Sequence, residues 1–428
     1  MKQLTAVVIG FGDRGQIYAG FAEREPNALK IAGVVEPDKL RRTLAAERFS
    51  LSEENCFASF DDFIKRGKIS DCVINGTMDS LHIATTLPVL KLGYDVLLEK
   101  PITNNSAELS RLLKAAGKYH RKVIICHVLR YVPFYKKIKR LILDGAIGEI
   151  RHIETSENVA IAHASAAFIR GKWNSKSACG SSYLLQKCCH DFDIICWLNN
   201  NTAPEYVSSV GGRDFFIPAK APAGSGTRCL SDCPANIEQN CPYSAKKIYA
   251  DNGIMPLDVW AGVGNFPKEL SYGEKIQSLK ADNPHGKCIY KTDADIVDQQ
   301  MTMIKFKNGS TAYHNLQSGT ARAGRRITVY GTKGEIEGFM EDERFYLRTY
   351  NPVNISYNEA KIEAGSEFAA NHAGGDIGLM YDFTDVLAGK PSSISTSSLE
   401  DSINSHLCVF AADKSMTEKK IIKVGYVK

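Results

Sequence analysis

The 428-residue sequence contains no apolar run of the ~18 residues that a membrane-spanning helix needs. Its formal net charge is only +5, and no basic stripe predicts binding to nucleic acid. Internal repeats are also absent. With 44% hydrophobic and 24% charged residues, the composition excludes disordered, collagen-like and coiled-coil chains. The length predicts two or three globular domains at ~150 residues each.

The N-terminus lacks an export signal as well. Leu4–Ile9 follows Met1 almost directly and runs into a glycine turn, which leaves no small-residue cleavage site. The segment therefore predicts a first buried strand, and we expect a cytoplasmic protein. In a reducing compartment, thiol or metal roles for the 12 cysteines take precedence over disulfides.

Residues 1–127 alternate short apolar strands with amphipathic helices. Strands are expected at Leu4–Ile9, Leu29–Val35, 72–74, 96–98 and 123–126. Helical patterns cover 16–23, 40–48, 81–92 and Ser106–Tyr119. This alternation predicts an α/β domain with a doubly wound parallel sheet, the Rossmann nucleotide-binding fold.

Residues 128–428 show a different pattern. Alternating stretches at 150–159, 297–306, 310–317 and 326–329 predict an α+β domain with a large, mostly antiparallel sheet. The turn Lys307-Asn308-Gly309 is typical of a hairpin between two of these strands. Residues 201–293 are rich in Gly, Pro, Ala and Cys, so we expect an insertion within this domain.

A glycine-rich turn follows the first strand and opens the first helix; it consists of Gly10, Phe11, Gly12, Asp13, Arg14 and Gly15. The spacing permits a tight turn, close approach of a pyrophosphate and close packing of helix on strand. Glu36 ends the second strand, about 20 residues further on, where a carboxylate can hold ribose hydroxyls. The pattern predicts NAD as cofactor, with NADP as an alternative because Arg41 and Arg42 lie nearby.

Two further segments carry chemistry. Glu99-Lys100-Pro101 ends the fourth predicted strand, at the edge of the sheet where ligands of this fold bind. A lysine there can hold a substrate hydroxyl and ease its deprotonation. The segment 184–193 places His190 near the start of a predicted helix.

Together, the glycine turn, the Glu-Lys-Pro triplet and the histidine segment resemble the Gfo/Idh/MocA family of sugar and cyclitol oxidoreductases over essentially the whole chain. The resemblance implies that Lys100 contacts both cofactor and substrate, with Glu99 as its orienting partner. It also implies cofactor contacts by Thr77, Met78 and His82. Residues near the nicotinamide and the substrate would be His127, Arg130 and Tyr131.

The histidine segment departs from the family pattern at one position. Many family members carry an aspartate four residues before the histidine, and Gln186 occupies that place here. Gln186 can bind substrate but cannot exchange a proton, which leaves Lys100 and His190 to handle the proton. Asp193 could face His190 on one helix, and the direction of Lys187 is not fixed by the sequence.

Further substrate contacts are implied by resemblance to a sugar-acting branch of the family. Arg170, Trp173 and Asn174 offer donors and an aromatic face suited to a pyranose, although a plain loop role is an alternative. His372 and Asp376 resemble a substrate-side loop, and Asp376 could equally be a helix N-cap.

Four cysteines of the insertion, Cys229, Cys233, Cys241 and Cys288, could bind a structural zinc ion. Their spacing is not a paired CxxC pattern, and buried free cysteines are an equal alternative. Cys188 and Cys189 beside His190 are a second candidate for metal, less favoured because adjacent residues seldom both bind one ion.

The first functional hypothesis is an NAD-dependent oxidoreductase, an enzyme that acts on a secondary alcohol of a sugar, glycoside or cyclitol. The second is a glycosidase that oxidises its substrate, eliminates the aglycone and reduces the product again with retained NAD. The third is a non-catalytic NAD- or sugar-binding sensor. We expect a small-molecule substrate, neither a nucleic acid nor a membrane as partner, and a homo-oligomer, either a dimer or a tetramer.

Overall fold

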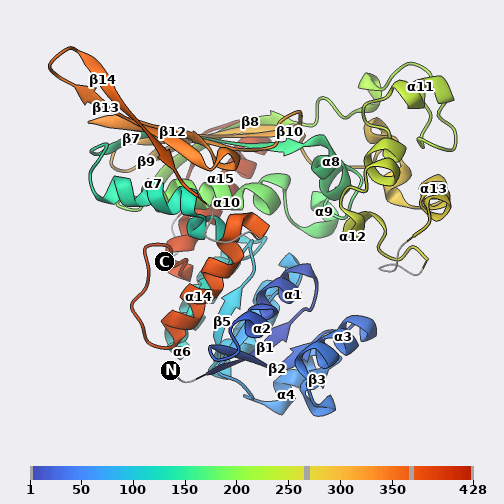
Figure 1. The fold of residues 1–428 in the computed structure, drawn as a ribbon, viewed down its shortest axis with the longest axis horizontal. Coiled ribbons are helices and arrows are strands. Elements are labelled where there is room, and N and C mark those ends of the chain that lie inside the picture. Colours follow the sequence, from blue (N-terminus) through green and yellow to red (C-terminus); the bar gives the residue numbers. More distant parts are fainter. Residues whose placement is uncertain (1–2, 265–269, 366–370, 426–428) are drawn as a thin grey trace.

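The computed structural model describes residues 3–264, 270–365 and 371–425. Figure 1 shows a smaller domain, coloured blue, below a large twisted sheet, with an insertion coloured green to yellow at one end of that sheet. Within the described residues, no helix is long and apolar enough to cross a membrane.

The smaller domain is built on a parallel sheet with the order β3-β2-β1-β4-β5-β6 among the described residues. Its strands are β1(Leu4–Ile9), β2(Leu29–Val35), β3(Cys56–Phe57), β4(Cys72–Asn75), β5(Asp95–Leu98) and β6(Val123–Ile125). Its helices are α1(Asp13–Ala19), α2(Phe21–Arg24), α3(Lys39–Phe49), α4(Phe60–Arg66), α5(His82–Lys91) and α6(Ser106–Tyr119). The expected Rossmann topology is confirmed, because the strand order reverses between β1 and β4. The sequence pattern missed the two-residue β3 and the short α4.

The second domain contains a sheet with the order β14-β13-β12-β11-β7-β10-β9-β8-β15 among the described residues. All neighbouring strands are antiparallel except β7 and β10, which run parallel. Its strands are β7(Ile150–Ala160), β8(Pro204–Gly212), β9(Gln299–Phe306), β10(Thr311–Thr320), β11(Gly324–Gly331), β12(Gly334–Phe339), β13(Arg344–Asn351), β14(Ser356–Glu363) and β15(Ile422–Lys423). The mostly antiparallel sheet is confirmed. So is the β9–β10 hairpin, where Gly309 has a positive φ of 92°.

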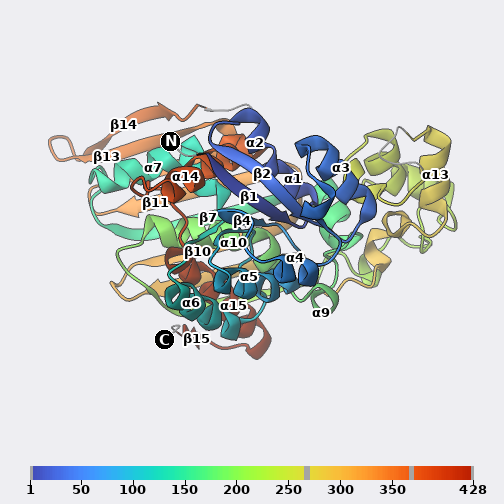
Figure 2. The same cartoon turned by 90° about the horizontal axis from the view of Figure 1, so that it is seen from below.

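Among the described residues, six α-helices of the second domain lie outside the insertion. They are α7(Pro133–Leu143), α8(Ile161–His163), α9(Lys176–Cys179), α10(Tyr183–Leu198), α14(Gly375–Leu387) and α15(Leu399–Glu418). Figure 2, seen from the side of the Rossmann domain, shows α6, α5 and α15 grouped together. One hydrophobic cluster includes Val7 of β1 as well as Phe192 of α10 and Leu316 of β10, so a continuous core joins both domains.

The C-terminal part of the chain returns to the Rossmann domain. Leu379, Met380 and Phe383 of α14 belong to the same buried cluster as Val8 and Tyr18. Packing of α14 on the Rossmann domain brings residue 376 close to the glycine turn, a contact between segments far apart in sequence.

The insertion begins later than the sequence predicted. Residues 204–212 form the strand β8 of the sheet. This strand contains Pro204, Gly211 and Gly212, so its composition is similar to that of the Gly- and Pro-rich insertion. The predicted start at residue 201 is therefore wrong. The helices α11(Ala235–Asn240), α12(Pro256–Val259) and α13(Tyr272–Lys280) follow. The insertion also has a small core of its own, in which Trp260 and Tyr249 are buried.

Candidate functional site

At two positions of the glycine turn, only glycine fits. At a third position, the turn leaves room for a dinucleotide. A Cβ on Gly15 would lie 2.1 Å from the carbonyl oxygen of Gly10, and Gly10 itself has a φ of 83°. A Cβ on Gly12, by contrast, would meet no atom within 4 Å. The turn therefore packs tightly against the protein at Gly10 and Gly15 and faces open space at Gly12. This arrangement fits a pyrophosphate that lies over the backbone of the turn.

Glu36 lies at the end of β2, with its carboxylate fixed by the backbone. Its Oε2 accepts the N–H of Phe11 at 2.7 Å and its Oε1 accepts that of Asp38 at 3.0 Å. Each carboxylate oxygen has a second lone pair, so ribose hydroxyls can still be bound. Arg42 donates to the carbonyl oxygens of Glu36 and Pro37 at 2.6 and 3.1 Å, so this arginine is held beside the adenosine end of the site.

Arg14 turns away from the turn and joins an ion-pair network behind it. Its Nε donates to Oε1 of Glu99 at 2.8 Å, and its Nη2 pairs with Asp376. Tyr18 donates to the same Glu99 oxygen at 2.7 Å. Burial alone would raise the pKa of Glu99, but Arg14 and Lys100 outweigh it and hold the pKa below its ordinary value. Glu99 is therefore an anion bound to Arg14 and Tyr18.

Lys100 reaches from the first domain to the second. Its backbone N–H donates to Oε2 of Glu99 at 2.6 Å, and the peptide bond to Pro101 is cis. Its Nζ donates to the carbonyl oxygen of Gln186 in the first turns of α10 at 3.0 Å. The ammonium group at the end of β5 thus lies against the helix that carries His190.

The loop after β4 is fixed to the Lys100 turn by His82. The two ring nitrogens of His82 lie 2.7 Å from the Pro101 carbonyl oxygen and 3.1 Å from that of Thr77. His82 is fully buried and positions this loop, and its predicted cofactor contact stays a prediction. Thr77 and the exposed Met78 lie on the loop that His82 holds, next to the turn at Gly76.

Asp79, in the helical turn η2(Asp79–Leu81), is a site residue that the sequence interpretation missed. Its Oδ2 accepts from the Ser181 hydroxyl at 2.8 Å and from the Gln186 side-chain amide. Burial raises the pKa of Asp79, and the charges of His82 and Lys100 oppose that shift. A carboxylate from the first domain therefore sits beside Gln186 and near Lys100. No pattern in the sequence marks this contact, because the partners are more than 100 residues away.

His190 is nearly buried on α10, and its ring centroid lies 5.9 Å from that of His127. His127 is fully buried, and burial lowers its pKa well below the ordinary value. Its Nε2 lies 3.6 Å from Oδ1 of Asp193. His127 is therefore a buried, neutral neighbour of His190, and its predicted place near the nicotinamide and the substrate stays a prediction.

Arg130 and Tyr131 of η3(Val128–Tyr131), which were predicted to lie near the substrate, have partners within the protein, and the prediction of a substrate contact stays a prediction. Arg130 is fully buried and binds Asp193 through two bonds, Nε–Oδ2 at 2.7 Å and Nη2–Oδ1 at 2.6 Å. The Tyr131 hydroxyl donates to Asp382 at 2.9 Å. Their polar groups already have protein partners, so both residues stabilise the domain junction. Asp193 likewise pairs with Arg130 rather than with His190.

Arg170, whose predicted substrate contact stays a prediction, is bound to the insertion. It is 1% exposed, and its guanidinium donates to the carbonyl oxygens of Lys287 and Tyr243 at 2.8 and 2.9 Å and to Ser165 at 2.7 Å. These bonds anchor the insertion to the sheet domain. Trp173 packs, partly buried, against the main core, and the carbonyl oxygen of Asn174 accepts the N–H of Asp295 at 3.0 Å.

Asp376, near the start of α14, forms the ion pair with Arg14 and is 3% exposed. Gly374 is the N-cap of that helix, so the alternative N-cap role of Asp376 is wrong as well. His372 lies in the turn η10(Asn371–Gly374), and its side chain is outside the described part of the chain.

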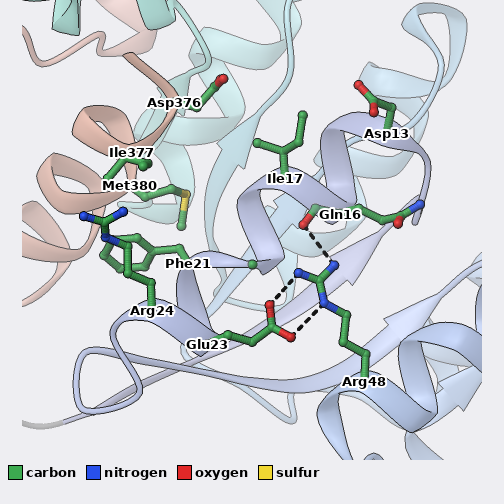
Figure 3. Close-up of a pocket in the computed structure, with 11 residues that line it drawn as sticks. Asp13, Gln16, Ile17, Phe21, Glu23, Arg24, Arg48, Asp376, Ile377 and Met380 are labelled. Atoms are coloured by element: carbon green, nitrogen blue, oxygen red, sulfur yellow. Dashed lines mark hydrogen bonds and ion pairs between the residues drawn. The ribbon is translucent and has the colours of Figure 1, made fainter. Parts of the chain in front are cut away.

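A pocket of about 470 Å³ opens beside α1, between α2 and the start of α14 (Figure 3). Arg48 spans it with bonds to both oxygens of Glu23, at 2.9 and 2.5 Å. Asp13 of the glycine turn and Asp376 line this pocket, whereas the glycines of the turn and Lys100 do not.

His163 lies near the positive charges of Lys187, Arg325 and Lys100. Nζ of Lys187 lies 3.5 Å from Oε1 of Glu157, so the Lys187 side chain points towards Glu157. The sequence alone did not determine this direction. Burial, together with Lys187, Arg325 and Lys100, lowers the pKa of His163 to about 3. His163 is thus a neutral, partly buried donor or acceptor that sequence reasoning missed, because a lone histidine among alanines carries no signal.

The four insertion cysteines were predicted either to bind a zinc ion or to be free. Cys229, Cys241 and Cys288 interact electrostatically around Arg170. Within the part of the chain that the structure describes, however, no three of the four sulfurs lie within 4.8 Å of one another. All 12 cysteines are free, and zinc at these four remains a prediction.

A glycine turn at the reversal point of a parallel sheet, facing a lysine and a histidine from two domains, defines a two-domain, nucleotide-dependent oxidoreductase. Comparison with protein families agrees with this class. Residues 4–127 match the model described as oxidoreductase family, NAD-binding Rossmann fold, and residues 139–424 match the C-terminal alpha/beta domain of that family. The chain therefore belongs to the Gfo/Idh/MocA family of oxidoreductases.

Similar proteins agree with this assignment. The oxidoreductase YteT of Bacillus subtilis is 27% identical over 376 residues, which cover 84% of this chain and 83% of that protein. An inositol 2-dehydrogenase of Leifsonia xyli is 27% identical over 198 residues, 44% of this chain and about half (52%) of that enzyme. Levoglucosan dehydrogenase in complex with NADH and levoglucosan has the same fold, with a TM-score of 0.70 at 16% identity over 99% of this chain and 100% of that one.

Proposed function

We propose that this enzyme oxidises a secondary alcohol of a sugar, glycoside or cyclitol with NAD, and that Lys100 and His190 handle the proton. The carbinol carbon loses a hydride, and its hydroxyl loses a proton, so that alcohol and NAD⁺ become ketone, NADH and H⁺. The similarity to an inositol dehydrogenase supports a polyhydroxylated substrate.

One observation carries the proposal: Nζ of Lys100 lies 3.0 Å from the carbonyl oxygen of Gln186, one helical turn before His190. An ammonium group has three donors, so Lys100 can keep this bond and still bind a substrate hydroxyl. Its charge stabilises the developing alkoxide, which favours loss of the proton to a nearby imidazole. His190 is the imidazole that α10 supplies.

The Gly10–Gly15 turn would hold the pyrophosphate of the cofactor, and Glu36 its ribose. When bound, the cofactor supplies the hydride acceptor. The open space outside Gly12 and the closed contact at Gly15 support this assignment. NAD is preferred because the Glu36 carboxylate repels a 2′-phosphate, whereas Arg42 nearby keeps NADP as the alternative.

The test is a panel of sugars, cyclitols and glycosides incubated with NAD or NADP, with NADH or NADPH formation followed by absorbance. We expect formation with at least one polyol, and a loss of about 10²–10⁴ in kcat for Lys100→Met and for His190→Asn. Lys65→Met and His120→Asn are matched surface controls. Confirmed cofactor binding without turnover across the panel contradicts the proposal. Release of an aglycone without net NADH identifies the glycosidase instead.

We further propose that the outer face of the second sheet joins copies of this chain into a homo-oligomer. Val210 of β8 lies opposite Met301 of β9, and both, together with Met303, are exposed. Light scattering on the purified protein tests this proposal: a multiple of the 47.1 kDa chain mass is expected, and Met301→Glu should lower it.

A further inference from the structure

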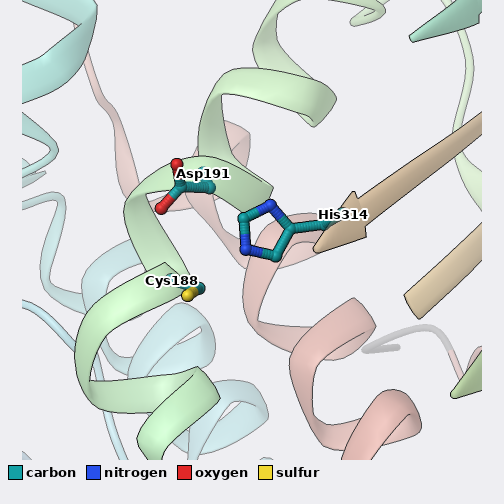
Figure 4. Close-up of side chains that lie close together, drawn as sticks. All are labelled: Cys188, Asp191 and His314. Atoms are coloured by element: carbon teal, nitrogen blue, oxygen red, sulfur yellow. The ribbon is translucent and has the colours of Figure 1, made fainter. Parts of the chain in front are cut away.

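A second buried cluster lies on the opposite side of α10 from the Lys100 contact. Cys188 and Asp191 of α10 meet His314 of β10, and their ligand atoms all lie within 4.8 Å of one another. Figure 4 shows the three side chains converging between the helix and the strand. All three residues are buried, and none of them takes part in the proposed proton transfer.

The histidine presents a lone pair to this cluster. Thr155 donates its hydroxyl to the carbonyl oxygen of Tyr313 at 3.3 Å, so its oxygen is available to accept from Nδ1 of His314 at 2.9 Å. The proton of the neutral ring is thereby placed on Nδ1, and Nε2 is left as the acceptor. In the described part of the chain, this buried Nε2 has no hydrogen-bond partner. Histidine ligands of metals are commonly oriented in this way, through a bond at the other ring nitrogen.

The aspartate is arranged in the same manner. Its Oδ1 accepts from Nε of Arg325 at 3.0 Å, whereas its buried Oδ2 makes no hydrogen bond within the described residues. Arg325 also pairs with Glu157 at 2.5 Å. Nε2 of His314 and Oδ2 of Asp191 therefore lack hydrogen-bond partners among the described residues. Nδ1 and Oδ1 of the same two side chains are bound by Thr155 and Arg325. Buried polar atoms of this kind call for a partner.

We propose that Cys188, Asp191 and His314 bind a zinc ion. One thiolate, one imidazole and one carboxylate are ligands that zinc accepts, with the fourth tetrahedral position filled by water. Binding replaces the S–H bond of Cys188 with a Zn–S bond and releases the proton to solvent. The ion would link α10 to β10 at the level of His190.

The test uses the full-length protein, purified without chelators, with metal content measured by mass spectrometry. Cys188→Ala and His314→Gln should each lose about one zinc per chain relative to the wild type. Cys233→Ser removes a sulfur of the insertion cluster and is the matched control, which should keep this zinc. Wild-type zinc content in both Cys188→Ala and His314→Gln overturns the proposal.

Cobalt substitution gives a second readout that does not depend on how Cys188→Ala folds. The Cys233→Ser protein, stripped of metal and loaded with Co²⁺, should show a thiolate-to-cobalt charge-transfer band of the intensity of one thiolate. His314→Gln in the same background should lose the tetrahedral absorption in the visible range. Absence of both bands in the Cys233→Ser protein overturns the proposal.

Discussion

The ion pair between Arg130 and Asp193 gives the sharpest prediction about a residue that the sequence assigned to substrate. The side chains are 0% and 1% exposed and share two charge-assisted bonds of 2.6 and 2.7 Å. Arg130→Met leaves the Asp193 carboxylate buried without its partner. Removal of one member of a buried pair costs about 3–5 kcal/mol, and we expect a loss of that size in the free energy of unfolding.

The assay is urea unfolding followed by tryptophan fluorescence, since the Trp197 ring lies 5.9 Å from the Arg130 guanidinium. The double variant Arg130→Met/Asp193→Leu removes both charges, and should recover most of the loss. Arg66→Met breaks the exposed pair with Glu54 and should change stability by less than about 1 kcal/mol. An Arg130→Met enzyme of wild-type stability with a raised KM would refute the structural role and return Arg130 to the substrate site.

Three further predictions concern the cofactor turn and the network behind Lys100. Gly15→Ala should lower the free energy of unfolding by about 1–3 kcal/mol, because the added Cβ collides with a backbone oxygen. Gly12→Ala should leave stability unchanged and lower only the affinity for NAD, as measured by calorimetry. The pKa of Glu99 is lower in the folded protein than its ordinary value of 4.5. The ionised carboxylate therefore contributes its full stabilisation of the fold above pH 4.5. The stability difference between wild type and Glu99→Gln should therefore shrink in urea titrations as the pH falls below 4.5; a constant difference would argue against a paired anion. Asp79→Asn should lower kcat more than NAD affinity, and equal losses would assign it a purely structural role.

Local patterns in the sequence were sufficient to predict that the glycine turn and Glu36 lie side by side. The glycine turn and Glu36 lie on consecutive elements of one βαβ unit, so their spacing alone predicts their meeting. The second sheet was predicted in part. β9 alternates between buried and exposed side chains, and β7 and β10 alternate between buried and half-buried ones. Nearly all of β14 is exposed, so its sequence shows no such alternation.

The substrate half could not be predicted in the same way, because its contacts join distant segments. Arg130 meets Asp193 63 residues away, and Arg170 meets Lys287 117 residues away. A buried arginine with a distant partner has the same local sequence signal as an arginine that faces a ligand. Asp79 was missed for the converse reason, since its neighbour Gln186 lies 107 residues further on.

The most direct test of the central claim separates catalysis from cofactor binding in Lys100→Met. With a polyol that the wild type oxidises, NADH formation is followed in single turnover, and the dissociation constant of NAD is measured on the same preparations. The account predicts a rate lower by at least about 10²-fold, with a much smaller change in NAD affinity. A Lys100→Met enzyme that forms NADH at the wild-type rate would contradict it.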